Sequence, residues 1–249
     1  MDKAVANTPP SSPKRRYRAL GVLGELLVTV GLVLALFVPW KLWWTDVEAH
    51  QNAQNELRVF DEEAEAAAGV PATETIDASE QRTDAAPVPT STSGEVFATL
   101  WVPRWGPDYR VPVAEGIDLL SVLNLGFAGH YPETSKLGQV GNFVLAAHRV
   151  SHGAAFRDVD TLVSGDALVV QTPEAWYVYT VTGSEIVQPT ETRVLASVPG
   201  DIDASPTMSV MTLTTCHPRL STRERFVVYS TLSWWAPRSA GWPPGVEAH

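Results

Sequence analysis

The chain contains one cysteine, Cys216, in surroundings that suit a reactive thiol. Cys216 ends an apolar run, SVMTLTTC, just before a turn at Pro218. His148 likewise ends the run NFVLAAH, and Arg225 begins the run RFVVYSTL. A thiolate can attack a carbonyl carbon, an imidazole can donate a proton to a leaving amine, and a guanidinium can stabilise the anion that develops. These residue types at the ends of predicted strands therefore favour acyl transfer.

Spacing alone does not decide which arginine stabilises the anion that develops, because other basic residues lie near Arg225. Arg219 and Arg223 compete with Arg225, and Arg223 shares a strand face with Arg225 if the strand begins at Arg223. His217 adjoins Cys216, but consecutive strand residues point to opposite faces. We therefore interpret His217 as a turn or groove residue.

These residue types also serve structural purposes in proteins. A free cysteine is usually a small buried apolar residue, and a single one cannot form an internal disulfide. We interpret His130 and His152 as polar loop residues. The sequence has no cluster of His, Asp and Glu at ligand spacing, so we predict neither a metal nor a cofactor.

The elements that must position these side chains are β-strands. From Val96 onward, short β-rich runs alternate with Gly and Pro turns, and only Leu119–Leu125 suggests a short helix. The runs are VFATLWVP, YRVPVAE, GNFVLAAH, DALVVQT, WYVYTVTGSEIV, SVMTLTTC and RFVVYSTLSWW. Several strands at this spacing predict an all-β domain, a barrel or a sandwich, of about 140 residues. That length is ample for one core.

A long apolar stretch precedes this domain. Residues 1–18 are polar and basic and predict a disordered tail, whereas residues 19–40 are almost wholly apolar. Twenty-two helical residues span about 33 Å, enough to cross a hydrocarbon core of roughly 30 Å. Trp40, Trp43 and Trp44 form an aromatic belt, so we predict an anchor over residues 19–44.

A cleaved signal peptide is the alternative for this stretch. The apolar run is longer than a typical signal, and no small-x-small cleavage site follows it. Lys14, Arg15, Arg16 and Arg18 precede the run, whereas mainly acidic residues follow it. The positive-inside rule therefore predicts a single-pass protein with a cytoplasmic N-terminus and an extracellular domain.

Charge is concentrated in the segment between anchor and domain. The chain has a formal net charge of −10, and residues 46–95 carry twelve acids against Arg58 and Arg82. Few large apolar residues follow Phe60, so we expect a disordered acidic linker over residues 45–95, within which Val47–Ala68 could form a charged helix. No basic patch with interleaved aromatic residues is present, which argues against a nucleic-acid partner.

The motifs around Cys216 and His148 resemble those of the sortase family. TLTTC (212–216), followed nine residues later by Arg225, is similar to the TLxTC…R motif, and residues 129–162 resemble the segment around the catalytic histidine. LTTCHPRLSTRERFVVYSTL (213–232) resembles class E, an actinobacterial housekeeping branch. The likeness extends over most of residues 96–235. We find no DPW-like lid motif of pilus-building sortases.

The resemblance implies a closed sortase-type barrel of about eight strands with short helices. It also implies a membrane-anchored cysteine transpeptidase. Such an enzyme cleaves a peptide bond as a thiol protease does, but it transfers the acyl group to an amine. Such an enzyme cleaves an LAxTG or LPxTG sorting signal between Thr and Gly through a thioester and passes the acyl group to a cell-wall amine. Its partners would be surface proteins bearing that signal and a peptidoglycan precursor amine.

The resemblance also assigns roles to residues. Cys216 would be the nucleophile, His148 the general acid and base, and Arg225 the oxyanion or substrate-orienting residue. Tyr131 matches a tyrosine implicated in the choice of LAxTG, and Thr214 matches a position that lines the same groove. The implied division of the chain is a tail (1–18), an anchor (19–44), a linker (45–95), a catalytic domain (96–238) and a C-terminal tail (239–249).

Two alternatives to the sortase interpretation can be compared with the sequence. Ser151-His152-Gly153 faintly resembles the SHG-C motif of L,D-transpeptidases, but Ala154 and Ala155 stand where the cysteine should follow, so that alternative fails. A non-catalytic, membrane-anchored extracellular β-domain that binds wall or protein partners is the second. The reactivity of Cys216 distinguishes an enzyme from such a binding domain.

Overall fold

The computed structural model describes residues 14–68 and 75–246. The chain divides into two compact units, Met1–Trp43 and Trp44–His249. The first unit contains the N-terminal part of α1 (Lys14–Ala68), where large apolar side chains are exposed and the stretch is long and apolar enough to cross a membrane. Exposed apolar surface on all sides of a helix is typical of a membrane span. The predicted tail, residues 1–18, lies largely outside the described residues.

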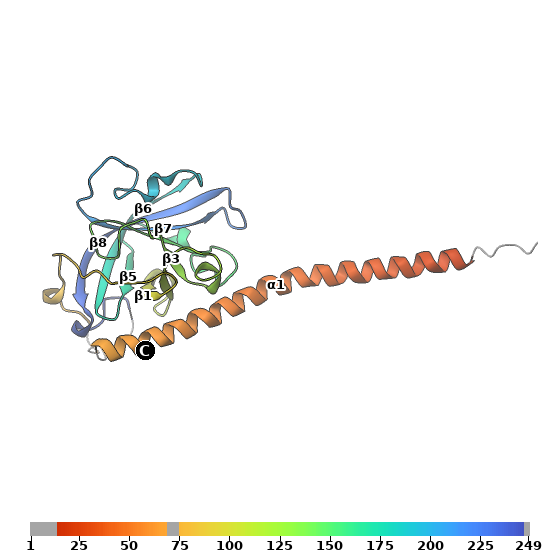
Figure 1. Ribbon diagram of the computed structural model, residues 1–249, viewed down its shortest axis with the longest axis horizontal. Coiled ribbons are helices and arrows are strands. Elements are labelled where there is room, and N and C mark those ends of the chain that lie inside the picture. The colour runs from red at the N-terminus through yellow and green to blue at the C-terminus, as the bar shows by residue number, and fades with distance from the viewer. Residues whose placement is uncertain (1–13, 69–74, 247–249) are drawn as a thin grey trace, which may run out of the picture. The chain divides into compact units, whose positions relative to one another are not determined.

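Eight strands in the second unit close into one barrel (Figure 1). Around the barrel their order is β1-β2-β3-β4-β7-β8-β6-β5. β2–β3 and β4–β7 pair in parallel, and the other neighbours pair antiparallel. The strands are β1 (Val96–Trp101), β2 (Arg110–Glu115), β3 (Ala128–His130), β4 (Gly141–Ala146), β5 (Ala167–Gln171), β6 (Ala175–Val187), β7 (Ser209–His217) and β8 (Glu224–Pro237). The predicted all-β barrel is thereby confirmed.

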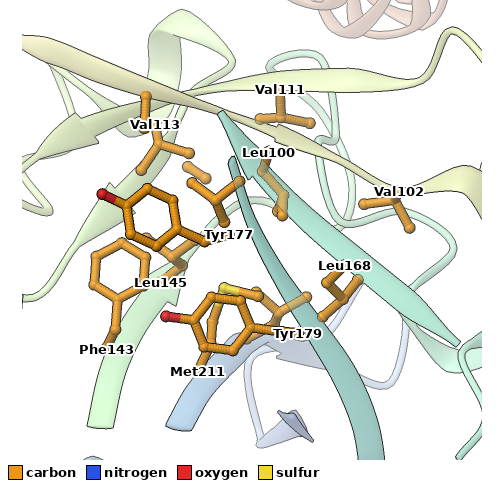
Figure 2. Packing of buried hydrophobic residues seen from close by; sticks show 14 of the residues in the cluster. Leu100, Val102, Val111, Val113, Phe143, Leu145, Leu168, Tyr177, Tyr179 and Met211 are labelled. Atoms are coloured by element: carbon orange, nitrogen blue, oxygen red, sulfur yellow. The ribbon is translucent and has the colours of Figure 1, made fainter. Parts of the chain in front are cut away.

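Alternate residues of these strands fill the barrel. Figure 2 shows side chains from several strands meeting in one cluster, with Tyr177 and Tyr179 of β6 beside Phe143 and Leu145 of β4 and Met211 of β7. All five are buried, with exposed fractions of 1% or less. Because strand side chains alternate between faces, this inward set fixes which residues of β4 and β7 face outward.

The shortest strand, β3, was not among the predicted runs. Its central residue, Gly129, lies so close to the neighbouring backbone that an added Cβ would sit 2.3 Å from the carbonyl oxygen of Gly116. The interpretation of His130 as a polar loop residue is wrong. His130 is 1% exposed, and its Nδ1 lies 3.0 Å from the Glu115 carboxylate.

The predicted short helix over Leu119–Leu125 is present only in part. The structure has a single 3-10 turn there, η3 (Leu123–Leu125). The Asp118 carboxylate accepts from the backbone N–H groups of Leu120 and Ser121 at 3.0 and 2.9 Å. A side chain that binds the backbone in this way favours a turn over a continuous helix.

The segment expected to be a disordered acidic linker is ordered in its described parts. α1 continues to Ala68, and one face of it is buried within the second unit. Farther along, Ile76 donates its N–H to the carbonyl of Trp242 at 2.9 Å, and Arg82 exchanges two backbone hydrogen bonds with Trp235. Trp242 and Val246, in the predicted C-terminal tail, belong to the same apolar cluster as Ile76. The domain boundaries at residues 96 and 238 stay predictions.

Candidate active site

Cys216 is near the end of β7 on the outer face of the barrel. Met211 and Leu213 of this strand belong to the core, so the alternate residues Thr212, Thr214 and Cys216 point to the other face. Cys216 is a free, half-buried cysteine. A strand end supplies a rigid backbone while leaving the thiol accessible.

Arg225 is the direct cross-strand partner of Cys216. The two residues pair in the antiparallel β7–β8 register, which places their side chains on the same face. Arg225 Nη1 donates to the carbonyl oxygens of Thr222 and Glu224 at 2.9 and 3.0 Å, which orients the guanidinium.

The competing arginines lie elsewhere. β8 begins at Glu224, so Arg223 falls in the preceding turn, where it is exposed. Arg219 donates to the carboxylate of Asp158 at 2.9 Å and to the carbonyl of Arg157 at 2.9 Å. Of the three arginines, only Arg225 is paired with Cys216 in the sheet.

His148 follows β4 and comes level with Cys216. β4 runs parallel to β7 with Ala146 paired to Thr214, and Ala147 donates its N–H to the Thr214 carbonyl at 3.3 Å. Continuing this register brings His148 and Cys216 to the same height. The side chain of His148 is on the outer face by the alternation that places Leu145 in the core.

The surroundings of His148 set its protonation. Its Nε2 donates to Asn124 Oδ1 at 2.9 Å, because an amide oxygen can only accept, and Nδ1 is left to exchange a proton. Burial lowers the pKa of His148, and the charge of His152, whose ring centroid lies 5.2 Å away, lowers it further. The imidazole is therefore mainly neutral at pH 7.

Of the two predicted substrate-binding residues, Tyr131 comes directly after β3, the neighbour of β4, and Thr214 lies on β7 itself. Tyr131 follows β3 and donates its N–H to the carbonyl of Val144 at 3.0 Å. Burial raises the pKa of Tyr131, the charge of Arg225 opposes that rise, and the charge of Cys216 adds to it. Tyr131 is thus within electrostatic reach of both. Thr214 is buried two residues before Cys216 on the same strand face.

A segment between β6 and β7 borders this outer face. The side-chain amide of Asn142, fully buried on β4, donates to the carbonyls of Val194 and Ala196, both at 3.0 Å. Its oxygen accepts from the Thr212 hydroxyl at 2.6 Å. Val194 also packs in an apolar cluster with Val227 of β8. These contacts attach η5 (Thr192–Leu195) to β4 and β8 beside the outer face of β7.

The sortase domain family matches residues 100–233, which is more than half of the chain. The chain belongs to the sortase family. Sortases are cysteine transpeptidases, so the family assignment agrees with a thiol, an imidazole and a guanidinium gathered at one end of a barrel.

The sortases of known sequence or structure that resemble this chain include class E members. Sortase SrtE1 of Streptomyces coelicolor is 33% identical over 227 residues, which cover 89% of this chain and 59% of that protein. The chain thus spans less than two thirds of this relative. The solved structure of SrtA sortase from Actinomyces oris is 40% identical, covers 68% of this chain and 97% of that one, and has a TM-score of 0.65.

A second solved structure, Sortase E1 from Streptomyces coelicolor with a tripeptide in the active site, is 36% identical. The match covers 63% of this chain and 99% of that one, with a TM-score of 0.57. These relatives confirm the predicted resemblance to class E sortases.

Two residues beside the candidate site were not predicted from the sequence. Asn124 contacts His148 directly, as described above. Arg149, buried to 3% exposure, donates through Nη1 to His217 Nδ1 at 2.9 Å and places Nη2 2.6 Å from the Asp160 carboxylate. Because Arg149 follows His148 and His217 follows Cys216, this contact joins the two segments that carry the candidate imidazole and thiol. Arg149 lies in a stretch that the sequence marks only as a polar loop, and Asn124 lies within Leu119–Leu125, where the sequence predicts a short helix without indicating a contact to His148.

Proposed function

We propose that this sortase is a membrane-anchored transpeptidase that acts through a thioester on Cys216. The observation that carries the proposal is the strand register, which pairs Cys216 with Arg225 and ends, on β4, at the Ala146–Thr214 pair, two residues before His148 and Cys216. A nucleophile, a proton-transfer group and an anion-stabilising group at one strand end are the parts that acyl transfer needs.

Acylation begins with the Cys216 sulfur. His148, mainly neutral at pH 7, takes the thiol proton as the sulfur attacks the threonine carbonyl carbon. Arg225 stabilises the negative oxygen of the tetrahedral intermediate. The bond between the threonine carbon and the glycine nitrogen then breaks, and the His148 imidazolium gives its proton to the departing amine. The products of this half-reaction are an acyl-Cys216 thioester and a free glycine amine.

Deacylation reverses these roles with a new amine. The acceptor amine attacks the thioester carbon and loses a proton to His148, and the carbon–sulfur bond breaks. The sulfur takes that proton back from His148, which restores the starting state. The acceptor amine in the proposal is that of a peptidoglycan precursor.

The sorting signal is the next part of the proposal. We assign an LAxTG or LPxTG-like peptide to the outer face of β7, beside Tyr131 and Thr214. The tripeptide in the active site of the Streptomyces coelicolor enzyme supports a peptide substrate in this region. The basic residues before the apolar stretch of α1 support a cytoplasmic N-terminus, with the barrel outside the cell.

The test uses the full chain in detergent with a sorting peptide and a peptide amine. We expect a transpeptidation product from an LAxTG or LPxTG peptide, the comparison of the two giving the preference, and none from Cys216→Ala. Arg225→Ala should lower the rate by about 10²–10³-fold, the typical cost of one oxyanion donor. Arg223→Ala is the matched control, because Arg223 is an exposed turn residue in the same connection, and it should stay within about twofold of wild type.

Two outcomes would overturn this proposal. Equal product from Cys216→Ala would exclude Cys216 as the nucleophile. No product from the wild-type chain with either peptide would favour the alternative of a non-catalytic, anchored binding domain.

A further inference from the structure

The second half of α1 has one face built into the barrel unit. Its buried residues recur every three or four positions, so they form a single helical face. They are Ala49, Ala53, Leu57, Phe60 and Ala64. Ala53 shares an apolar cluster with Val122 and Phe127, and Asp61 pairs with Arg110 of β2 at 2.7 Å. This half of the helix is therefore a fixed part of the unit that carries the candidate site.

The first turns of this buried face meet the two segments that surround His148. A Cβ added to Gly126 would lie 2.9 Å from the carbonyl oxygen of Ala49, so helix and turn approach at backbone distance. Gly153 donates its N–H to Asp46 Oδ1 at 3.1 Å, and a Cβ on Gly153 would lie 3.5 Å from the Cβ of Ala49.

Both segments hold His148 in place. Asn124, two residues before Gly126, is the hydrogen-bond partner of the imidazole, and His152, one residue before Gly153, lies beside the ring. The loop with His152 contains four consecutive residues of positive φ, which are Ser151 (66°), His152 (48°), Gly153 (79°) and Ala154 (46°). Three of them are not glycine, so surrounding contacts must stabilise this conformation.

We infer that Asp46 and Ala49 are positioning residues for catalysis, which hold the 151–154 loop and the Asn124 turn so that His148 stays beside Cys216. Asp46 acts by accepting the Gly153 N–H, and Ala49 by being small enough for two glycine backbones to approach. The inference rests on the proposed function for the role of His148. It adds that the helix continuing from the apolar anchor stretch is part of the catalytic apparatus.

The effect of the Asp46 charge on the position of the loop can be separated from the effect of the hydrogen bond that Asp46 accepts from Gly153. Asp46 also lies 3.9 Å from the guanidinium of Arg157, but both side chains are substantially exposed, so that ion pair is worth little. Asp46→Asn keeps an oxygen acceptor for Gly153 and removes the charge, whereas Asp46→Ala removes both. Glu48→Ala is the control, because Glu48 is an exposed carboxylate on the same turn of α1.

The experiment measures iodoacetamide alkylation of the full chain in detergent at pH 7, together with amide exchange of residues 149–156. Cys216 is the only cysteine, so alkylation reports this thiol alone. We expect Asp46→Ala to slow alkylation by about threefold or more, because the thiol loses its nearby base, and to speed exchange in the loop. Asp46→Asn and Glu48→Ala should match wild type. Ala49→Leu should behave like Asp46→Ala.

Each other result would overturn the inference. Faster loop exchange in Asp46→Ala with unchanged alkylation would show that the loop does not position His148. Equal slowing in Asp46→Asn would assign the effect to charge. Alkylation needs no sorting peptide, so a wild-type chain that forms no transpeptidation product would count against the proposed function and leave this measurement valid.

Discussion

Cys216 and Arg225 are nine residues apart in the chain but directly opposite each other in the β7–β8 pair. Direct pairing fixes both side chains on one face without help from loops, which are the more mobile parts of a fold. His148 differs, because it lies beyond the end of β4 and depends on Asn124 and on the loop with His152. At the scale of single residues, the imidazole is thus the group whose position needs the most support.

The Asn124 amide predicts a change in pH dependence. In the proposed mechanism acylation needs neutral His148, so the rate should fall as pH drops through the pKa of His148. Asn124→Ala removes the acceptor that stabilises the imidazolium, which should lower that pKa further and move the acid limb of kcat/KM to lower pH. Asn124→Asp places an anion at Nε2 and should move the limb upward by about one unit. Misorientation of the ring should also lower the rate of Asn124→Ala by about tenfold.

A pH–rate profile of each full-length variant checks this prediction. Thermal unfolding of the same samples serves as the control, since a purely structural effect would lower the melting temperature and leave the limb in place. Superimposable profiles for wild type, Asn124→Ala and Asn124→Asp would show that Asn124 does not govern the protonation of His148.

At the scale of elements, the sequence predicts strands where long apolar runs are bounded by turns, and these runs correspond to seven of the eight strands. β3 has only three residues with glycine at its centre, so it carries no period-two pattern of its own.

Arg225 could not be separated from Arg223 by alternation, because the answer depends on where β8 begins. The selection of Arg225 over Arg223 therefore required the family resemblance.

The buried face of α1 shows a different limit of sequence reasoning. Seven acids lie in the part of α1 within residues 44–68, and three of its five buried residues are alanines, which contribute little to an apolar pattern. The close approach of Ala49 to Gly126 and Gly153 involves residues that are far apart in the chain. Such contacts follow from the folded arrangement alone, so the sequence predicted Cys216 and His148 but neither Asn124 nor Asp46.

Truncation tests the contribution of α1 to stability. A chain that begins at Trp44 retains the buried helix face and should be soluble and β-rich by circular dichroism. A chain that begins at residue 75 loses Leu57 and Phe60, each 2% exposed or less, and burial of such side chains contributes about 1.5–3 kcal/mol apiece. We expect its free energy of unfolding to be lower by roughly 3–6 kcal/mol in urea titrations. Equal stability of the two chains would contradict a structural role for this half of α1.

At the scale of the whole molecule, one chain combines an apolar helical stretch with a closed barrel that carries a single thiol. Bases precede the apolar stretch and acids follow it, as expected for an anchor with its domain outside the cell. In the proposed function, the substrates carry sorting signals at the same surface, so an anchored enzyme would meet them there. The proposed function of the whole molecule therefore depends on the chemistry of Cys216.

Intact mass spectrometry tests that chemistry most directly. The full chain is mixed with an LAxTG peptide in the absence of an acceptor amine, quenched in acid and weighed. We predict a gain equal to the acyl fragment ending in threonine, located on Cys216, discharged when an amine is added, and absent from Cys216→Ala. Cleavage of the peptide without an adduct on Cys216, or an adduct on another residue, would contradict the account.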